Sequence, residues 1–211
     1  MNCTLCHSSN TVVYTQLPTE QYFQCSDCSL IFQDPETYLD NVEEKARYET
    51  HENNPEDQGY RKFLSRVVDP LLERINKDDL GLDFGCGPGP TISVMLGEKG
   101  ITVDNYDLYF MPETELVENK YDFITSTEVF EHFYKPGEEF EKVWSLLKPG
   151  GLLGVMTVFY PDSVEKFHSW WYKNDPTHVC FFSPEAFEFI AQKYGAKLEI
   201  IGDQVIFLRK E

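Results

Sequence analysis

Basic residues are scarce in this chain of 211 residues, which has 18 Lys and Arg against 36 Asp and Glu and a net charge of −18. The first Lys or Arg is Lys45, so residues 1–44 contain neither. Proteins that bind nucleic acids owe much of their affinity to clustered Lys and Arg, which release counterions from the phosphates. The composition therefore argues against a nucleic-acid partner, and we attribute the acidity to solubility.

Long apolar runs are missing as well. No run approaches the ~18 residues that a membrane span needs, so we expect no membrane association. The N-terminal residues lack the basic start and apolar stretch of a secretory signal, which favours the cytoplasm. Hydrophobic residues make up 41% of the chain and aromatic residues 15%. This is enough for one packed domain with a small appendage.

Four of the 6 cysteines form two C-x-x-C pairs: Cys3 with Cys6, and Cys25 with Cys28. Four thiolates in two such pairs suit a tetrahedral structural zinc, and a cytoplasmic setting disfavours the competing explanation, disulfides. We predict a zinc-binding ribbon over residues 1–36, with strands at 11–14 and 21–24. A lobe of this size cannot bury enough surface to fold alone, so metal binding is expected to drive its folding.

Residues 37–78 are predicted to form a linker and a packing helix. The linker is polar and acidic, but Tyr48 and His51 are unusual in a simple tether. We therefore expect it to help close the ribbon over a bound substrate. The helix is predicted at about residues 57–76, where apolar residues recur at helical spacing.

A glycine-rich turn follows the apolar run at residues 80–82 and contains Asp83, Gly85, Gly87 and Gly89. A turn without side chains lets the backbone approach a nucleotide-like ligand. Asp107 ends the next predicted strand, where a carboxylate can accept hydrogen bonds from a ribose diol. A dinucleotide site would need a glycine where Pro90 stands, which disfavours a hydride-transferring enzyme.

Strands and helices alternate over residues 79–211. We predict helices at 91–98, from about 137 to 148, and at 184–194. We predict strands at 101–107, 121–126, 152–158, 197–201 and 204–209. The alternation indicates an α/β fold with a doubly wound, mostly parallel sheet and a ligand at the carboxyl ends of its strands.

Four segments occur in the order typical of class I methyltransferases that use S-adenosylmethionine (SAM), and the chain resembles this family. The segments are LDFGCGPG, the NYDLYF that contains Asp107, YDFITSTEVFEHF and LLKPGGLLGVMT. The C-x-x-C pairs and DPTHVCFFSPEAF resemble a bacterial subgroup with an N-terminal zinc ribbon.

The resemblance implies a Rossmann-like SAM-binding domain at residues 79–211. It implies that the methionine part of SAM binds near Asp83, Gly85 and Gly87, that Asp107 binds the ribose, and that Thr127 and Glu128 also contact the cofactor. The segment between residues 108 and 121 is too short for the extra strand and helix that usually help to hold the adenine. We expect that strand to be lost or reduced.

His178, in the polar loop Asp175-Pro176-Thr177-His178, is the first candidate for a general base because imidazole titrates near neutral pH. A structural role in the loop is the alternative. His132 and Glu131 are the next catalytic candidates. Glu128, Glu131 and His132 also resemble residues that hold magnesium beside a catechol in quinone-biosynthesis O-methyltransferases. Many relatives have similar residues without a metal, so magnesium is the less favoured alternative.

Six aromatic residues are candidates to wall the substrate site, with core packing as the alternative for at least half of them: Tyr22, Tyr160, Trp170, Trp171, Phe181 and Phe182. The expected function is methyl transfer from SAM to a small molecule such as a sugar, a quinol or a phenolic metabolite. The alternatives are an RNA or protein methyltransferase whose ribbon grips the polymer, and a SAM-binding protein without catalysis. The oligomeric state is left open.

Overall fold

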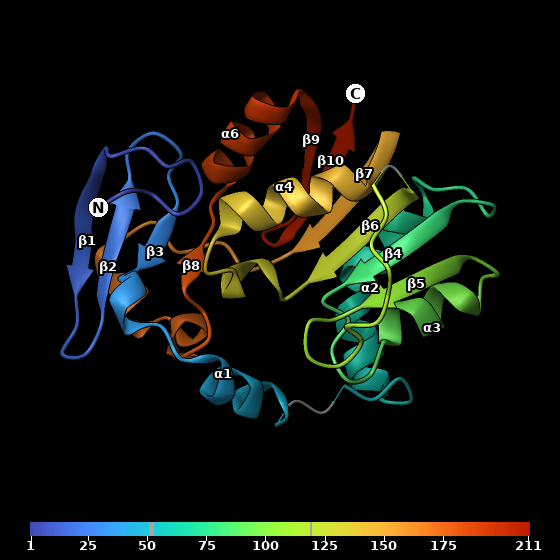
Figure 1. The fold of residues 1–211 in the computed structure, drawn as a ribbon, viewed down its shortest axis with the longest axis horizontal. Coiled ribbons are helices and arrows are strands. Elements are labelled where there is room, and N and C mark those ends of the chain that lie inside the picture. Colours follow the sequence, from blue (N-terminus) through green and yellow to red (C-terminus); the bar gives the residue numbers. More distant parts are fainter. Residues whose placement is uncertain (51–52, 119) are drawn as a thin grey trace.

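The main body of the structure is a six-stranded sheet with the strand order β5-β4-β6-β7-β10-β9 (Figure 1). The structure is a computed structural model that describes residues 1–50, 53–118 and 120–211. The first four strands are parallel: β4 (Leu80–Phe84), β5 (Thr102–Tyr106), β6 (Tyr121–Thr127) and β7 (Leu147–Met156). Strand β10 (Val205–Lys210) runs antiparallel to β7 and to β9 (Ala196–Ile201). The predicted α/β fold with a mostly parallel sheet is confirmed.

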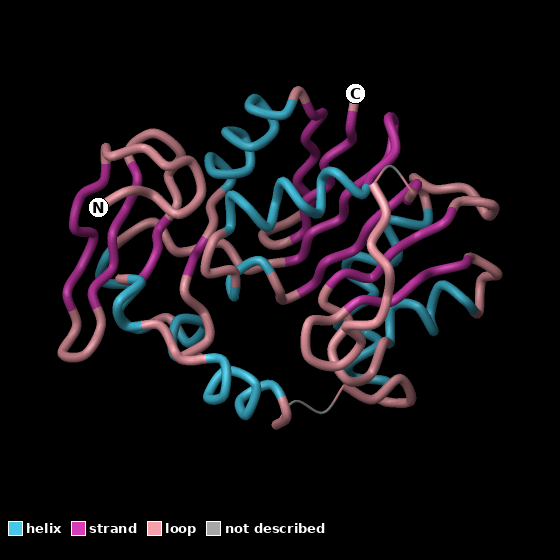
Figure 2. The backbone as a smooth tube through the Cα atoms, viewed as in Figure 1, coloured by secondary structure: helices cyan, strands magenta, loops and turns pink. Residues whose placement is uncertain are grey.

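Helices cover both faces of this sheet (Figure 2), as expected for a doubly wound fold. Helices α2 (Gln58–Leu72) and α3 (Thr91–Gly97) share a buried cluster with Phe123. Helices α4 (Pro136–Leu146) and α6 (Pro184–Tyr194) share another with Ile124. Because neighbouring strand residues point to opposite faces, these two positions of β6 separate the two clusters. Among the described residues, no helix combines the length and apolar character needed to cross a membrane.

The boundary between α4 and β7 differs from the prediction. The helix ends at Leu146 and the strand begins at once, so the Pro149-Gly150-Gly151 turn lies inside β7 rather than before it. Tyr121 pairs with Leu147, and after a shift of register Phe123 pairs with Leu152. Gly150 has a φ of 80°, which lets the chain bend within the strand and resume pairing.

The C-terminal elements agree with the sequence. The Ser183 hydroxyl accepts a hydrogen bond from the Ala186 N–H at 3.3 Å and caps α6. Gly195 and Gly202 have φ values of 62° and 64°, which fit the predicted helix end and hairpin turn. The short segment after β5 contains turns and one isolated bridge between Asp107 and Met111, and its described residues form no strand.

The cysteine-containing ribbon is joined to the main body through a shared sheet. Its strands are β1 (Thr11–Gln16), β2 (Gln21–Cys25) and β3 (Ile31–Gln33), and β8 (Cys180–Phe181) pairs with β3 as the fourth. Behind the sheet, α5 (Val164–Ser169) contributes the buried Phe167, which packs with Tyr22 and Phe181. Domain boundaries after residues 36 and 78 stay predictions.

The linker holds a helix that the sequence analysis missed. After the 3-10 turn η1 (Pro35–Thr37), α1 (Asn41–Tyr48) begins with a capping box in which Asp40 and Glu43 bond each other's backbone N–H groups. This spacing of two acidic residues was the available signal. His51, part of the expected closure, lies outside the described residues.

The first cysteine pair docks against the start of α4 through a glycine. The Gly137 N–H donates a hydrogen bond to the Thr4 carbonyl at 3.2 Å. A Cβ atom at this position would collide with the Leu5 carbonyl oxygen. The ribbon can therefore approach the helix this closely only because residue 137 has no side chain.

We predict that Gly137→Ala destabilises the protein by about 1–3 kcal/mol because the ribbon backbone must move away from α4. Urea unfolding followed by circular dichroism measures the loss. Gly97→Ala is the matched control, because no atom lies within 4 Å of its added Cβ; it should be neutral or stabilising by at most ~1 kcal/mol. Equal effects of both changes would contradict the proposed docking.

Candidate active site

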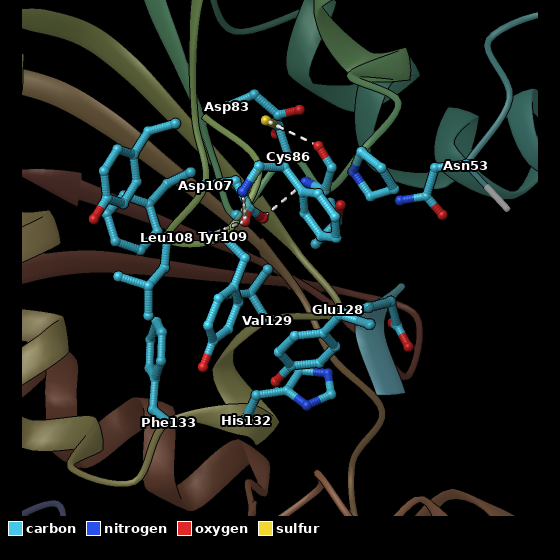
Figure 3. Close-up of a pocket in the computed structure, with 18 of the residues that line it drawn as sticks. Asn53, Asp83, Cys86, Asp107, Leu108, Tyr109, Glu128, Val129, His132 and Phe133 are labelled. Carbon is cyan, nitrogen blue, oxygen red and sulfur yellow. Dashed lines mark hydrogen bonds between the residues drawn. The ribbon is translucent and has the colours of Figure 1, made fainter. Parts of the chain in front are cut away.

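A cavity of about 770 Å³ lies at the carboxyl ends of β4, β5 and β6. This volume is in the range of about 300–1,000 Å³ that small-molecule sites occupy. The structure brings eight of the predicted site residues to its wall: Asp83, Gly85, Gly87, Asp107, Thr127, Glu128, His132 and His178. Figure 3 shows the glycine turn and Asp107 on one side and His132 on another.

The glycine turn has a conformation that side chains would not allow. Gly85 and Gly87 have φ values of 80° and 65°, in the left-handed region. An added Cβ at Gly85 would collide with Val129, and one at Gly87 would collide with the Asn53 side chain. Asn53, in the segment before α2, thus lies against the turn (Figure 3).

The carboxylate of Asp107 connects this turn to the loop after β5. One of its oxygens accepts a hydrogen bond from the Gly87 N–H at 2.9 Å. The other accepts from the N–H groups of Tyr109 at 2.9 Å and Phe110 at 3.1 Å. A carboxylate offers about four lone-pair positions, so the carboxylate keeps capacity for a further donor.

Asp83 is buried beneath the turn and is only 3% exposed. Its carboxyl accepts a hydrogen bond from the Thr125 hydroxyl at 2.9 Å. Burial raises the pKa of Asp83 to about 7; the Thr125 hydrogen bond opposes this rise and the charge of Asp107 adds to it. The carboxyl therefore titrates near neutral pH, and its burial as an anion costs stability.

Glu128 also lines the cavity, in a strained backbone conformation with a φ of 54°. Its Oε1 atom is buried and has no hydrogen-bond partner among the described residues. Burial is the main cause that raises the pKa of Glu128 to about 9, and the charge of Glu131 is the second cause. A buried carboxyl with an unused oxygen is costly unless a ligand completes its bonding.

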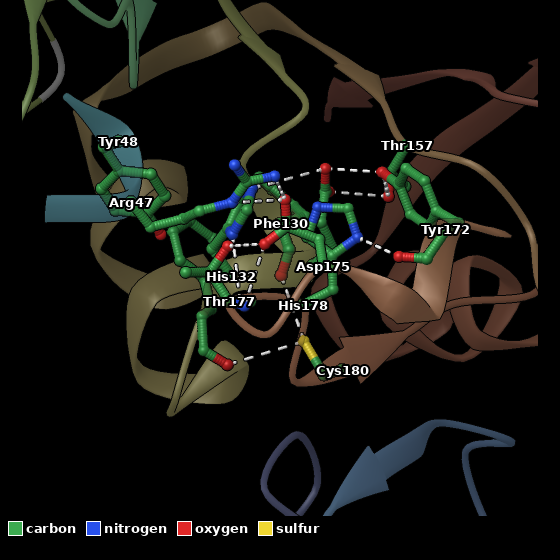
Figure 4. Close-up of polar contacts among 12 residues, drawn as sticks. Arg47, Tyr48, Phe130, His132, Thr157, Tyr172, Asp175, Thr177, His178 and Cys180 are labelled. Carbon is green, nitrogen blue, oxygen red and sulfur yellow. Dashed lines mark hydrogen bonds and ion pairs between the residues drawn. The ribbon is translucent and has the colours of Figure 1, made fainter. Parts of the chain in front are cut away.

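Glu131 lies behind the cavity wall, in the 3-10 turn η2 (Phe130–His132), and is fully buried. The hydroxyl of Thr157 donates to one carboxylate oxygen at 2.8 Å, and that of Tyr172 to the other at 2.5 Å. The His132 Nε2 atom is 3.9 Å from the latter oxygen. Figure 4 labels the neighbouring residues His132, Thr157 and Tyr172. Burial raises the pKa of Glu131, while the neighbouring His178 opposes the rise.

Backbone carbonyl groups orient the two histidines. The Nδ1 atom of His132 is 3.1 Å from the Thr177 carbonyl oxygen, and that of His178 is 2.7 Å from the Tyr172 carbonyl oxygen. Because a carbonyl only accepts, each Nδ1 carries the proton, and Nε2 is the basic nitrogen of each neutral ring. The rings contact each other at 4.6 Å between centroids.

Helix α1 forms part of the cavity wall and contacts this histidine pair. Arg47 forms an ion pair with Asp175 at 2.6 Å, and Asp175 accepts hydrogen bonds from the Thr177 N–H and hydroxyl. Burial alone would raise the pKa of Asp175. The hydrogen bonds from Arg47 and Thr177 outweigh this effect and hold the pKa well below its usual range. The Tyr48 ring packs on the His132 ring at 5.3 Å. Tyr48 was expected near a bound substrate, but the helix that carries it was not predicted.

The predicted aromatic wall does not form, and core packing, the alternative for at least half of its members, holds for five of the six. None of the six proposed residues is among the described residues that line the cavity. Four of them pack in the ribbon cluster behind β3, Phe182 is in the main core, and Trp171 is 68% exposed. The cavity is instead lined by five tyrosines, which are Tyr48, Tyr60, Tyr106, Tyr109 and Tyr134.

The four cysteines of the two pairs form a separate cluster in which all sulfur atoms lie within 4.8 Å of one another. The sulfurs of Cys3 and Cys28 are 3.5 Å apart, as are those of Cys6 and Cys25. His7 and Ser29, each directly after the second cysteine of a pair, have φ values of 62° and 61°. The two turns thus share one conformation, and the four thiols fit a tetrahedral metal.

The order of the main sheet, with a glycine turn after β4 and an acidic residue at the end of β5, is the Rossmann-like fold of class I methyltransferases. The sequence matches the family described as a methyltransferase domain over residues 57–199. This match covers more than half of the chain, so the protein belongs to this methyltransferase family. No protein of curated function matches the sequence significantly.

Solved structures share the fold at low sequence identity. PH0226 of Pyrococcus horikoshii has a TM-score of 0.59 at 16% identity, covering 80% of this chain and 99% of its own. Magnesium protoporphyrin IX methyltransferase from Synechocystis, with bound S-adenosylhomocysteine, has a TM-score of 0.58 at 14% identity, covering 81% and 94%. Phosphoethanolamine N-methyltransferase 2 from Haemonchus contortus, in complex with SAM, has a TM-score of 0.52 at 20% identity, covering 74% and 41%.

We predict that Asp83→Asn stabilises the protein at alkaline pH, because a neutral amide replaces a buried carboxylate and keeps an oxygen for Thr125. Between the ordinary pKa of 3.8 and the folded value of about 7, the native state binds more protons than the unfolded state. Wild-type stability therefore falls as pH rises through this window. The gain should reach up to about 4 kcal/mol above pH 7 and shrink towards pH 4, as measured by urea unfolding.

Asp122→Asn is the control of opposite sign. Asp122 forms an ion pair with Lys148 at 2.8 Å, and its pKa is lowered although burial opposes this. This variant should lose stability at pH 8. If Asp83→Asn were destabilising to the same degree at pH 5 and pH 8, the buried charge would not be the cause.

Proposed function

We propose that the protein transfers the methyl group of SAM to a small-molecule acceptor inside the cavity. One observation carries this proposal: a single cavity is lined both by the glycine turn with Asp107 and by His132 and His178. A cofactor and an acceptor bound at these two ends would meet within it. Membership of a methyltransferase family supports the reaction class, and the SAM and S-adenosylhomocysteine bound in two relatives of the same fold support the cofactor.

The cofactor end suits the separate parts of SAM. The turn at Gly85 and Gly87, above Asp83, would hold the methionine part, and the spare capacity of the Asp107 carboxylate would take a ribose hydroxyl. Thr127 and Glu128 lie at the end of β6 beside this place. The buried Oε1 of Glu128, which has no hydrogen-bond partner among the described residues, is a suitable acceptor for the ammonium group of the methionine part.

At the acceptor end, we assign proton removal to His178, with His132 and Glu131 in support. In the transfer, a lone pair of the acceptor forms a bond to the methyl carbon while the bond from that carbon to sulfur breaks. S-adenosylhomocysteine leaves, and the acceptor's proton passes to an imidazole Nε2. Alignment of the three atoms provides much of the catalysis, because SAM is already activated.

The walls of the cavity favour a small acceptor such as a sugar, a quinol or a phenolic metabolite. Five tyrosines and two histidines offer hydroxyl and ring contacts, and aromatic faces also favour the sulfonium cation. An RNA or protein acceptor held by the ribbon is the second candidate. The absence of Lys and Arg from residues 1–44 argues against RNA.

The cysteine cluster is proposed as a structural zinc site formed by Cys3, Cys6, Cys25 and Cys28. Four sulfur donors leave no open position for a substrate, so the metal would stabilise the fold and take no part in the chemistry. Hydrogen bonding with Cys28 lowers the pKa of Cys3 to about 5, whereas the Cys3 partner and burial raise that of Cys28. A dication would compensate the clustered thiolates.

Two variants separate cofactor binding from turnover. Asp107→Ala should weaken SAM binding in calorimetry, because the ribose loses its acceptor and the turn loses its tie. His178→Ala should bind SAM as the wild type does and lose ~100-fold or more in turnover. Transfer is measured with radiolabelled SAM against sugars, quinols, phenols and short RNAs.

His168→Ala is the matched control, because this exposed imidazole on α5 bonds Thr15 and neither residue is among the described residues that line the cavity. It should change neither SAM binding nor turnover. Unchanged turnover in His178→Ala would remove His178 from catalysis. Wild-type protein that does not bind SAM would refute the proposed function itself.

We predict that a mercurial thiol reagent releases one zinc ion per chain, because the reagent reacts with the thiolates that bind the zinc. A coloured chelator measures the release. Circular dichroism should show that structure is lost at the same time, since metal binding drives the folding of so small a lobe. Intact structure without any released zinc would mean that the cysteines pack as free thiols.

A further inference from the structure

We infer that Glu131, His132 and His178 form a second cation site, which takes a divalent transition metal and opens into the acceptor end of the cavity. Each of the three residues offers a ligand atom, and these atoms all lie within 4.8 Å of one another. The residues come from two places in the chain, η2 and the loop before β8. None of them belongs to the cysteine cluster.

The hydrogen bonds of the two imidazoles match those of metal ligands. A histidine that binds a metal through one nitrogen usually donates its other N–H to a carbonyl or a carboxylate, which fixes the ring. Both histidines do this here, through Nδ1, to the carbonyl groups of Thr177 and Tyr172. In a neutral ring whose proton is on Nδ1, the nitrogen that can bind a metal is Nε2.

The carboxylate of Glu131 is held in a comparable way. Its two oxygens accept from the hydroxyls of Thr157 and Tyr172, and each oxygen keeps a second lone pair. The group is fully buried. A buried carboxylate needs a cationic partner, and a cation between it and the two imidazoles would meet this need.

The donor set indicates the kind of metal. Two imidazole nitrogens and one carboxylate suit Zn²⁺, Fe²⁺, Co²⁺ or Mn²⁺, whereas magnesium prefers oxygen ligands. Glu128, which the magnesium alternative would require, is not a member of the cluster. Three protein ligands leave at least one coordination position open, and His132 and His178 line the cavity into which it would face.

The inference rests on the proposed function for the location of the acceptor, and with the metal bound solvent replaces His178 as the proton acceptor. An imidazole that binds a metal cannot also take the acceptor's proton through the same nitrogen. With the site loaded, the cation would lower the pKa of an acceptor hydroxyl, and the proton would leave to solvent. The metal count, by contrast, does not depend on any transfer reaction.

The test is the metal content of the full chain, measured by mass spectrometry after equilibration in turn with zinc, cobalt, iron(II) and manganese under reducing conditions. We expect a second equivalent beyond the one that a mercurial reagent releases from the cysteines. His178→Gln and His132→Gln should lose that second equivalent and keep the first. Both should still bind SAM, which shows that they are folded.

His168→Gln, which removes an imidazole outside the cavity, should keep both equivalents. A single equivalent in the wild type with every metal would overturn the inference, and so would a second equivalent that survives in His178→Gln. Failure of the proposed function has a different signature, namely no SAM binding or no methyl transfer by protein whose metal content is as expected.

Discussion

The carboxylate of Asp107 sets the shape of the cavity. It is bonded to the Gly87 N–H on one side and to the backbone of residues 109 and 110 on the other, so the loops after β4 and β5 are fixed relative to each other. The glycine turn can adopt its left-handed conformation only without side chains, and this interaction determines where it points. Asp83 and Glu128 lie at neighbouring strand ends, and they line the same cavity as the turn only while the turn keeps this position.

A second constraint acts on the opposite wall, where the histidines are placed by segments far apart in sequence. The loop at residues 175–178 is organised by Asp175, which α1 holds through Arg47. The same loop continues into β8, which is part of the ribbon sheet. The cysteine cluster, helix α1 and the histidine wall of the cavity are therefore one connected structure. The ribbon also shares the main core, since Leu5, Leu30 and Phe32 pack in the same cluster as Phe140 of α4.

The sequence was sufficient for the sheet, the two cysteine pairs, and the glycine turn with Asp107 that lines the cavity. These features depend on local patterns: alternating strands and helices, C-x-x-C spacing, and an acidic residue followed by alternate glycines. The histidine wall of the cavity was predictable in its residues but not in their contacts. His132, His178 and Glu131 could be named as residues, but their carbonyl partners, the position of α1 and the pairing of β3 with β8 are contacts over long sequence separations, which no local pattern contains. The aromatic wall could not be predicted for the same reason, since the tyrosines that line the cavity come from four separate segments.

The pairing of Phe32 with Cys180 has a consequence for the order of assembly. A ribosome releases the first three strands of the small sheet long before the partner strand that completes it. Until then, the edge of β3 is unpaired and the apolar side chains behind it are exposed. Both conditions favour aggregation of the nascent chain. When the late strand arrives, its docking positions His178 in the same event. Maturation of the ribbon and of the cavity wall that contains His178 would thus be a single, late step, with the slow kinetics expected of distant contacts.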